Sequence, residues 1–334
     1  MEIKNFLKKS KIKFSKSKYV KFFLKYLNVD TVFLSYHRVL SDIEFESEIR
    51  PDNNLVVSKS IFDKQIKFIS QNFNPTSIND VFKKSFDGKN KIVITFDDGY
   101  LDNIINAVPI LKKYNCPAII YVTTGFLGNK NIAWWIRLWD LILNSSEIFY
   151  MGKRINISKL QEKKKTYNLI KNNLFLMKSE GINNFFDDFK TENLDTSSLE
   201  KNIFMNYEDL KKINAEKLIE IGCHTHSHQN LKILTEFEIK EELTKSKEFL
   251  ESLLEREIKH FSIPFGGKNS YSENILKIIY NLNFETIVTT NHDIFKKKNF
   301  LKIPRIGIGN NDIDDYLYSK LIGFDSLINK LLFR

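Results

Sequence analysis

Residues 91–100 carry the sequence KIVITFDDGY, which combines a short apolar run with two adjacent carboxylates. The run from Lys91 to Phe96 is rich in β-branched side chains, which is typical of a strand buried on both faces. Asp97 and Asp98 follow where this strand ends, and neighbouring side chains on an extended backbone point in different directions. One carboxylate could therefore bind a cation while the other stays free as a base. A plain turn or helix cap would also account for an Asp-Asp-Gly sequence.

Similar apolar runs recur along the chain and alternate with segments of helical periodicity. Besides Lys91–Phe96, the runs are residues 32–39, 118–124, 218–223, 260–264, 285–290 and 302–308. One segment with helical periodicity follows Ser58, which could cap it. The others are residues 102–114, 236–254 and 272–282. This alternation predicts an α/β fold with a parallel sheet, either open or closed into a barrel.

The length of 334 residues suits one large α/β barrel or two smaller domains, and a hydrophobic fraction of 42% supports a sizeable core. We expect a basic segment at residues 1–30, a β/α barrel domain at 31–310 and a helical segment at 311–334. The barrel is interrupted at 126–214 by a polar insertion without a clear buried strand. The insertion contains Trp134, Trp135 and Trp139, which are all the tryptophans of the chain. They belong either to a partly ordered lid or substrate wall, or to an anchor that holds the insertion on the core.

Much of the formal net charge of +10 lies at the start of the chain, where nine lysines and a single acid, Glu2, precede residue 27. Aromatic residues alternate with these lysines, as in a helix that lies on an anionic membrane surface. A solvated, Lys-rich surface accounts for the same composition. No nucleic-acid recognition module accompanies the basic stretch, so we expect no nucleic-acid partner.

Two features of the sequence bear on location. The two cysteines, Cys116 and Cys223, are too few for a disulfide scaffold and suit a reducing compartment or buried thiols. The N-terminus lacks the apolar region of a secretory signal, and no run approaches the ~18 apolar residues of a membrane-spanning helix. We expect a cytoplasmic protein, with peripheral contact at the inner membrane face as an alternative for its basic segment.

A histidine cluster follows the strand predicted at residues 218–223. His224, His226 and His228 are three of only six histidines in the chain. The i,i+4 spacing of His224 and His228 would bring both rings to one metal ion if a helical turn formed here. Because active sites in parallel α/β folds gather at the carboxyl ends of strands, we expect this cluster to lie near Asp98.

Two further segments also follow predicted strands. Pro264 and two glycines fix a loop at residues 261–267 with exposed backbone N–H groups, which could stabilise an oxyanion or simply form a turn. His37 ends the first strand, where it is either a buried core residue or an active-site acid.

Together these residues resemble the polysaccharide deacetylases, the NodB-homology carbohydrate esterases of family 4. TFDDGY at 95–100 is similar to the first family motif, and HTHSH at 224–228 is similar to the second. The resemblance extends over roughly residues 32–308 outside the insertion. It implies a distorted (β/α)7 barrel of NodB-homology type with a long helical insertion.

The resemblance also implies a role for individual residues. Asp97 would be the general base, and three residues would hold a divalent metal, expected to be zinc: Asp98, His224 and His228. The backbone N–H of Phe265 would stabilise the oxyanion, with Pro264, Arg305 and Tyr100 completing the substrate site. The reaction implied is hydrolysis of the N-acetyl group of an N-acetylhexosamine in a surface polysaccharide or a glycan precursor.

The sequence departs from the family pattern at two positions. Many members have an arginine, which orients the catalytic aspartate, where this chain has Ser262; Arg305 could supply a guanidinium instead. Many members also have a late Leu-x-His motif that provides the general acid, whereas the only late histidine here is His292. The chain is more similar to the subgroup that includes poly-N-acetylglucosamine deacetylases, in which a Tyr-His segment like Tyr36-His37 supplies the acid. The resemblance therefore implies that His37 is the acid.

Two alternatives stay open. The same fold could serve as a catalytically silent glycan-binding protein, for which the missing arginine and late histidine would be the signs. The same metal and base could instead hydrolyse a non-sugar acylamide.

Overall fold

The structure is a computed structural model that describes residues 31–51, 55–81, 83, 90–129, 131–188, 202–291, 293, 295 and 300–322. The basic segment 1–30, His292 and the chain beyond residue 322 lie outside the described residues. What the sequence predicts for them stays a prediction. No helix within the described parts of the chain combines the length and apolar character needed to cross a membrane.

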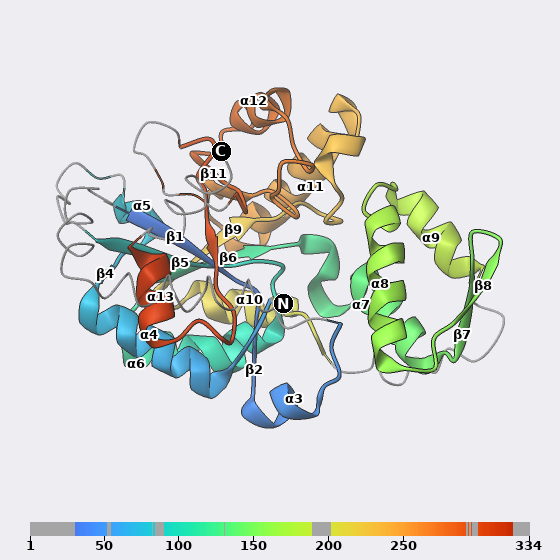
Figure 1. Ribbon diagram of the computed structural model, residues 1–334. Coiled ribbons are helices and arrows are strands. Elements are labelled where there is room, and N and C mark those ends of the chain that lie inside the picture. The colour runs from blue at the N-terminus through green and yellow to red at the C-terminus, as the bar shows by residue number, and fades with distance from the viewer. Residues whose placement is uncertain are drawn as a thin grey trace, which may run out of the picture.

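A parallel sheet forms the centre of the molecule (Figure 1), with the order β11-β10-β9-β6-β5-β1-β12 and β4 beside the start of β5. Its strands are β1 (Thr31–Tyr36), β4 (Asn74–Pro75), β5 (Lys91–Phe96), β6 (Ala118–Val122), β9 (Ile219–Cys223), β10 (His260–Ser262), β11 (Thr286–Val288) and β12 (Ile306–Gly307). Every residue of β1, β5 and β6 is buried. The seven principal strands occur where the sequence predicts them.

One short segment joins the two edges of this sheet. Ile303 bridges to Val288 in β11, and three residues later Ile306 pairs with Leu34 in β1. The sheet therefore curls into a distorted barrel, which confirms the predicted fold class. Arg305 lies within the closing segment, and its side chain is fully buried.

Helices cover the outside of the barrel, with α4 and α6 below the sheet and α11 and α12 above it in Figure 1. Their bounds are α4 (Lys59–Asn72), α5 (Ile78–Val81), α6 (Val108–Lys113), α10 (Tyr207–Asn214), α11 (Glu236–Leu254), α12 (Glu273–Asn281) and α13 (Asp314–Leu321). As predicted, Ser58 caps α4 by accepting a hydrogen bond from the backbone N–H of Ile61. The predicted helix 236–254 is α11 with the same ends.

The helix predicted at residues 102–114 begins instead with a π-helical turn, η1 (Asn103–Ala107), and continues as α6. Pro109 lies in the first turn of α6 and has no backbone N–H to donate, so the regular hydrogen-bond pattern is interrupted there. Two polar residues of the π turn, Asn103 and Asn106, are buried. Such turns are frequent at functional sites.

The predicted insertion at 126–214 contains a separate lobe. It is built from α7 (Trp134–Asn144), the hairpin β7 (Glu147–Tyr150) and β8 (Lys153–Asn156), α8 (Leu160–Leu174) and α9 (Ser179–Asp187). The lobe has its own hydrophobic cluster, formed around Leu138, Ile142 and Ile170. By contrast, Leu210 and Ile213 of α10 belong to the barrel core, although they lie within the predicted insertion. The predicted domain bounds stay predictions.

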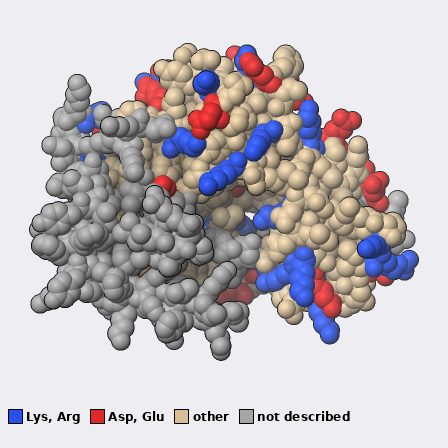
Figure 2. Space-filling model, turned by 45° about the horizontal axis from the view of Figure 1, so that its top comes forward, with Lys and Arg blue, Asp and Glu red and all other residues tan. Residues whose placement is uncertain are grey.

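The lobe stands beside the barrel in Figure 1, and Figure 2 shows a hollow between the two. On the described part of that face, Lys and Arg side chains alternate with Asp and Glu side chains. Between β1 and α4 the chain forms a second, two-stranded parallel sheet. It consists of β2 (Arg38–Leu40) and β3 (Val56–Ser58), and the short helix α3 (Asp42–Ser47) lies between them in the sequence.

His260 at the start of β10 makes the stability of the fold sensitive to acid. Its Nδ1 and Nε2 lie 2.9 Å from Thr286 Oγ1 and 2.9 Å from Asn79 Oδ1, and burial lowers the pKa of the imidazole to about 4. The unfolded chain binds this proton near pH 6.5, so the folding free energy should fall as the pH drops from about 6.5 to 4. The expected loss is about 3 kcal/mol. Urea midpoints at pH 7, 5.5 and 4 should show a smaller loss for His260→Gln, and equal losses would contradict this assignment.

Candidate active site

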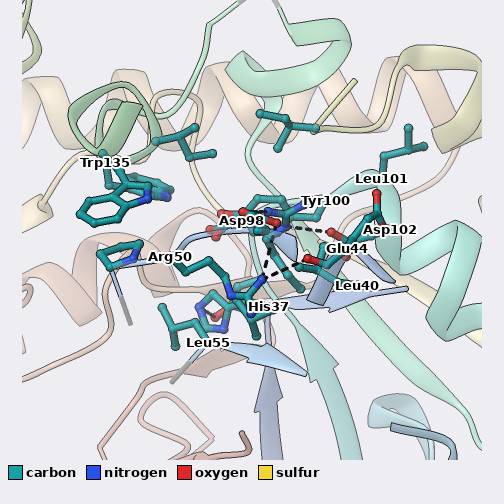
Figure 3. A pocket seen from close by; sticks show the side chains of 18 of the residues that line it. His37, Leu40, Glu44, Arg50, Leu55, Asp98, Tyr100, Leu101, Asp102 and Trp135 are labelled. Carbon is teal, nitrogen blue, oxygen red and sulfur yellow. Dashed lines mark hydrogen bonds and ion pairs between the residues drawn. The ribbon is translucent and has the colours of Figure 1, made fainter. Parts of the chain in front are cut away.

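Loops that follow β1, β5, β9 and β10 meet at the carboxyl end of the barrel and surround a pocket of about 1240 Å³. The predicted site residues on its wall are His37, Asp97, Asp98, Tyr100, His224, His228 and Phe265. In Figure 3, His37 and Asp98 lie at the centre, with Trp135 on one side and Leu101 and Asp102 on the other. The structure thus brings together residues that are more than two hundred positions apart in the sequence, such as His37 and Phe265.

Asp98, His224 and His228 point their side chains at one another. Asp98 Oδ1 lies 3.4 Å from His224 Nε2 and 3.2 Å from His228 Nε2, and all three residues are buried. One ligand atom from each residue lies within 4.8 Å of the other two. His224 Nδ1 donates a hydrogen bond of 2.7 Å to the carbonyl oxygen of Ser262, which orients the ring and leaves Nε2 toward Asp98.

This arrangement fits a metal ion by its chemistry. Asp98 Oδ1 is buried, yet it accepts no hydrogen bond from the described residues. An unpaired buried acceptor costs about 1–3 kcal/mol, so a structure that keeps one usually has a partner for it. One carboxylate and two imidazoles are the donor set of many catalytic zinc sites.

The two adjacent carboxylates separate because the chain turns sharply between them. Asp97 continues the strand, and its N–H donates to the carbonyl oxygen of Tyr36 at 3.1 Å. Asp98 and Gly99 then take left-handed φ angles of 76° and 83°. A Cβ on Gly99 would lie 3.3 Å from Val122 Cγ1, so both the φ angle and the space favour glycine here.

The histidine loop differs from its prediction, because residues 224–228 form no helical turn. Thr225 and His228 have left-handed φ angles of 66° and 56°, and the His228 N–H donates to Thr225 Oγ1 at 3.0 Å. This compact loop directs both outer rings at Asp98. The ring of His226 points elsewhere, with Nδ1 3.0 Å from Thr124 Oγ1.

Arg305 fixes the position of the other carboxylate, Asp97. Its two terminal nitrogens donate to Asp97 Oδ1 and Oδ2 at 2.7 and 2.6 Å. The remaining N–H groups donate to three oxygens, those of Thr95 Oγ1 at 2.8 Å, Ser262 Oγ at 2.9 Å and Thr289 O at 3.1 Å. All five N–H donors of the guanidinium are therefore used. Ser262 stands where many family members have arginine, and here it accepts a bond from an arginine that arrives from the closing segment.

The charges around the site keep both carboxylates ionised. Burial raises the pKa of Asp97, but the Arg305 guanidinium together with the imidazoles of His224 and His37 outweighs burial and holds this pKa below its ordinary value. Burial likewise raises the pKa of Asp98, while the imidazoles of His224 and His228 bring it well below the usual range. At neutral pH the site therefore holds two negative charges a few atoms apart.

His37 lies next to Asp97, with its Nε2 3.8 Å from Asp97 Oδ2. Its Nδ1 is buried and has no hydrogen-bond partner among the described residues. The backbone around His37 is held by the π turn, since Asn103 Nδ2 donates to the His37 carbonyl at 2.7 Å and Asn106 Nδ2 to the Val39 carbonyl at 2.8 Å. Asp102 Oδ1 also accepts from the Val39 N–H at 2.9 Å.

The supporting roles of Asp102, Asn103 and Asn106 were not predicted from the sequence. The available signal was the occurrence of Asp102, Asn103 and Asn106 in a segment whose other residues are largely apolar. Polar residues on the buried side of a helix need partners, and here the partners are backbone groups of the His37 segment.

Phe265 also takes a left-handed φ angle, 61°, directly after Pro264. Its carbonyl oxygen accepts a hydrogen bond of 2.7 Å from Thr290 Oγ1, which holds the loop. No partner for its backbone N–H lies among the described residues. The Phe265 ring packs against His228, with ring centroids 4.7 Å apart.

The three tryptophans of the lobe occupy two kinds of position. Trp134 and Trp135 line the pocket, and the Trp135 ring lies 4.8 Å from that of His228. Trp139 anchors the lobe, because its indole N–H donates to the carbonyl oxygen of Ile49 at 2.7 Å. Tyr100, on the pocket wall, stacks on Phe204 with ring centroids 4.9 Å apart.

Parts of the chain are similar in sequence to two known proteins. An alignment of length 120 with poly-beta-1,6-N-acetyl-D-glucosamine N-deacetylase from Staphylococcus aureus shows 36% identity and covers 32% of this chain and 41% of that protein. An alignment of length 88 with the putative polysaccharide deacetylase YxkH of Bacillus subtilis shows 33% identity and covers 25% of this chain and 32% of that protein. The match thus spans about two fifths, or less, of the length of these curated relatives.

Solved structures show the same fold. The deacetylase PplD of Streptococcus pyogenes, in complex with acetate, aligns with a TM-score of 0.56 and 19% identity over 88% of this chain and 97% of its own. IcaB from Ammonifex degensii aligns with a TM-score of 0.57 and 15% identity over the same shares, 88% and 97%. The sequence model of the family described as polysaccharide deacetylase matches residues 84–155 and 170–287, more than half of the chain. The chain therefore belongs to the polysaccharide deacetylase family.

Proposed function

We propose that this protein is a metal-dependent deacetylase that hydrolyses the N-acetyl group of an N-acetylhexosamine in a surface polysaccharide or a glycan precursor. One observation carries the proposal. A buried set of metal-binding side chains, Asp98, His224 and His228, lies beside a second buried carboxylate, Asp97, which Arg305 holds in a fixed orientation.

Asp98, His224 and His228 would hold a divalent metal, for which zinc suits the donor set, and the ion would supply Lewis-acid polarisation of the acetamide carbonyl. Asp97 takes the proton from the attacking water, since it is ionised and its two oxygens are oriented by the guanidinium. The backbone N–H of Phe265 donates to the oxyanion that forms on the former carbonyl oxygen.

The departing amine needs a proton, because an amide nitrogen is a poor leaving group in its anionic form. His37 stands beside Asp97 on the pocket wall and gives this proton as the general acid. Two groups thus divide the proton transfers, with Asp97 taking one from water and His37 giving one to nitrogen. The products are acetate and a free amino sugar.

Two observations support a glycan substrate. The Staphylococcus aureus relative is named for poly-beta-1,6-N-acetyl-D-glucosamine, a polymer of an N-acetylhexosamine. The pocket, at about 1240 Å³, is larger than the roughly 300–1,000 Å³ of sites for drug-sized ligands, which suits a substrate of more than one sugar ring. Trp134 and Trp135 line it near His228 and offer apolar surface to such rings.

We predict that His224→Ala and His228→Ala lose the metal, because each removes one of three ligands. His226→Ala is the matched control and should keep it, since the His226 ring bonds to Thr124 rather than facing Asp98. Metal content after dialysis, measured by plasma mass spectrometry, checks this prediction. Full metal occupancy in either His224→Ala or His228→Ala would remove that residue from the ligand set.

Asp97→Asn should keep the metal and lose about 10²–10⁴-fold in turnover, because the amide cannot take up the proton of water. Acetate release from N-acetylglucosamine oligomers measures the rate, and thermal unfolding shows whether the variant is folded. Activity close to that of the wild type would rule out Asp97 as the base.

His37→Ala should slow hydrolysis of the amide far more than that of an activated acetyl ester, whose leaving group needs no proton. Metal content and thermal unfolding should not change, because His37 is not a proposed ligand. Parallel assays with both substrates measure the difference.

His292→Ala is the control for this prediction, as the late histidine provides the acid in many family members. Equal losses of His37→Ala on amide and ester would indicate a structural role for His37. Loss of amide hydrolysis in His292→Ala, with His37→Ala active, would place the acid in the late position. A wild type that binds metal and N-acetylglucosamine oligomers but releases no acetate from them would be a silent glycan-binding member of the family.

A further inference from the structure

Glu242, on α11, contacts the loop that carries His224 and His228. We propose that it is a positioning residue, which holds this loop in the one conformation that directs both rings at Asp98 and thereby sets the affinity of the metal site. This role rests on the proposed function, because it assumes that the three side chains bind a metal.

The loop has a backbone conformation that does not persist by itself. Thr225 and His228 have φ angles of 66° and 56°, in the left-handed region that residues with a Cβ rarely adopt. A β-branched residue such as threonine is a clear outlier there, and each residue held in this way costs about 1–3 kcal/mol. Contacts with the rest of the molecule must compensate for this cost.

The Glu242 carboxylate supplies such contacts between the two proposed ligands. Its Oε2 accepts hydrogen bonds from the backbone N–H groups of His226 at 3.1 Å and Ser227 at 2.8 Å. Its Oε1 accepts one from the Ser227 hydroxyl at 2.6 Å. Bonds to an ionised acceptor are stronger than those between neutral groups, so one side chain fixes both central residues of the loop.

Among the described residues, every hydrogen bond of this carboxylate goes to residues 226–229. No ion pair with a described Lys or Arg residue gives Glu242 a second role. All the hydrogen bonds of Glu242 with described residues therefore go to the loop and to the residue that follows it.

A second residue of α11 fixes the start of the same loop. Ser246 lies one turn after Glu242, and its hydroxyl donates to the Thr225 carbonyl oxygen at 2.9 Å. It also accepts from the Cys223 thiol at 3.2 Å, which ties it to the end of β9. Since i and i+4 share one helix face, α11 presents an acceptor and a donor to the loop together.

On the opposite side, Gly125 approaches the loop so closely that a Cβ there would lie 2.4 Å from the His226 carbonyl oxygen. The Gly125 N–H donates to that oxygen at 2.7 Å. The loop is thus held between η2 (Thr124–Asn129) and α11. Loss of the Glu242 contacts leaves His226 and Ser227 without support from α11, although Ser246 still holds Thr225. His228 can then relax toward an ordinary φ angle and move its ring away from Asp98.

Metal affinity measures this role directly. The variants are Glu242→Ala, and Glu241→Ala as the matched control on the exposed neighbouring position. Zn²⁺ affinity is measured by competition with a chelator, and the Co²⁺-loaded protein gives a visible spectrum that reports the geometry of the ligands. Glu242→Ala should weaken Zn²⁺ binding by about 10–100-fold, the loss typical of residues that support metal ligands, and should alter the Co²⁺ spectrum.

Glu242→Gln should recover much of the affinity, because its amide oxygen still accepts from the backbone N–H groups. Wild-type Zn²⁺ affinity and an unchanged Co²⁺ spectrum in Glu242→Ala would overturn the positioning role and leave the proposed function intact. A wild-type chain that binds neither metal would overturn both.

If Glu242→Ala does not fold, Ser227→Ala provides the second measurement, since it removes only the hydroxyl that donates to Oε1. A moderate loss of Zn²⁺ affinity supports the role, and an unchanged affinity overturns it.

Discussion

The buried ion pair between Arg305 and Asp97 is the constraint on which the site depends. A guanidinium without solvent contact is tolerated only when its donors are satisfied, and here oxygens from the ends of β5 and β10 and from the residue after β11 surround it. Removing one partner of such a pair typically costs about 3–5 kcal/mol. The same positive charge helps to hold the pKa of Asp97 below its ordinary value, while the imidazoles of His224 and His228 do so for Asp98, so the two carboxylates stay ionised side by side.

The Arg305 guanidinium comes from the segment that closes the barrel. Arg305 lies between the bridge of Ile303 to β11 and the pairing of Ile306 with β1, so the segment that joins the edges of the sheet also orients the proposed base. The shape of the barrel and the geometry of the chemistry are therefore coupled. Helical elements outside the sheet hold the loops that follow the strands. The π turn bonds to the backbone of the His37 segment, and α11 bonds to the histidine loop.

The sequence predicted the strands and the long helices, and it predicted that the candidate residues would gather at the carboxyl end of the barrel, because apolar periodicity and strand-end position carry that information. It could not show the left-handed angles of Thr225 and His228, which tertiary contacts impose against local preference. The π turn was not predicted either, because the spacing of apolar residues does not show where the backbone hydrogen bonds of a helix change from the i→i−4 to the i→i−5 pattern. The packing of α10 on the barrel was not predicted either. The apolar side chains of Leu210 and Ile213 indicate that they are buried, but they do not indicate whether the lobe or the barrel buries them.

The separate hydrophobic cluster of the lobe has a consequence for how such a protein can diverge. Because the lobe and the barrel bury different sets of apolar residues, changes inside one alter the local stability of that part more than the other. The lobe nevertheless contributes Trp134 and Trp135 to the pocket wall. Substrate preference can therefore drift through insertions and replacements in the lobe, while the ends of the barrel strands preserve the reaction.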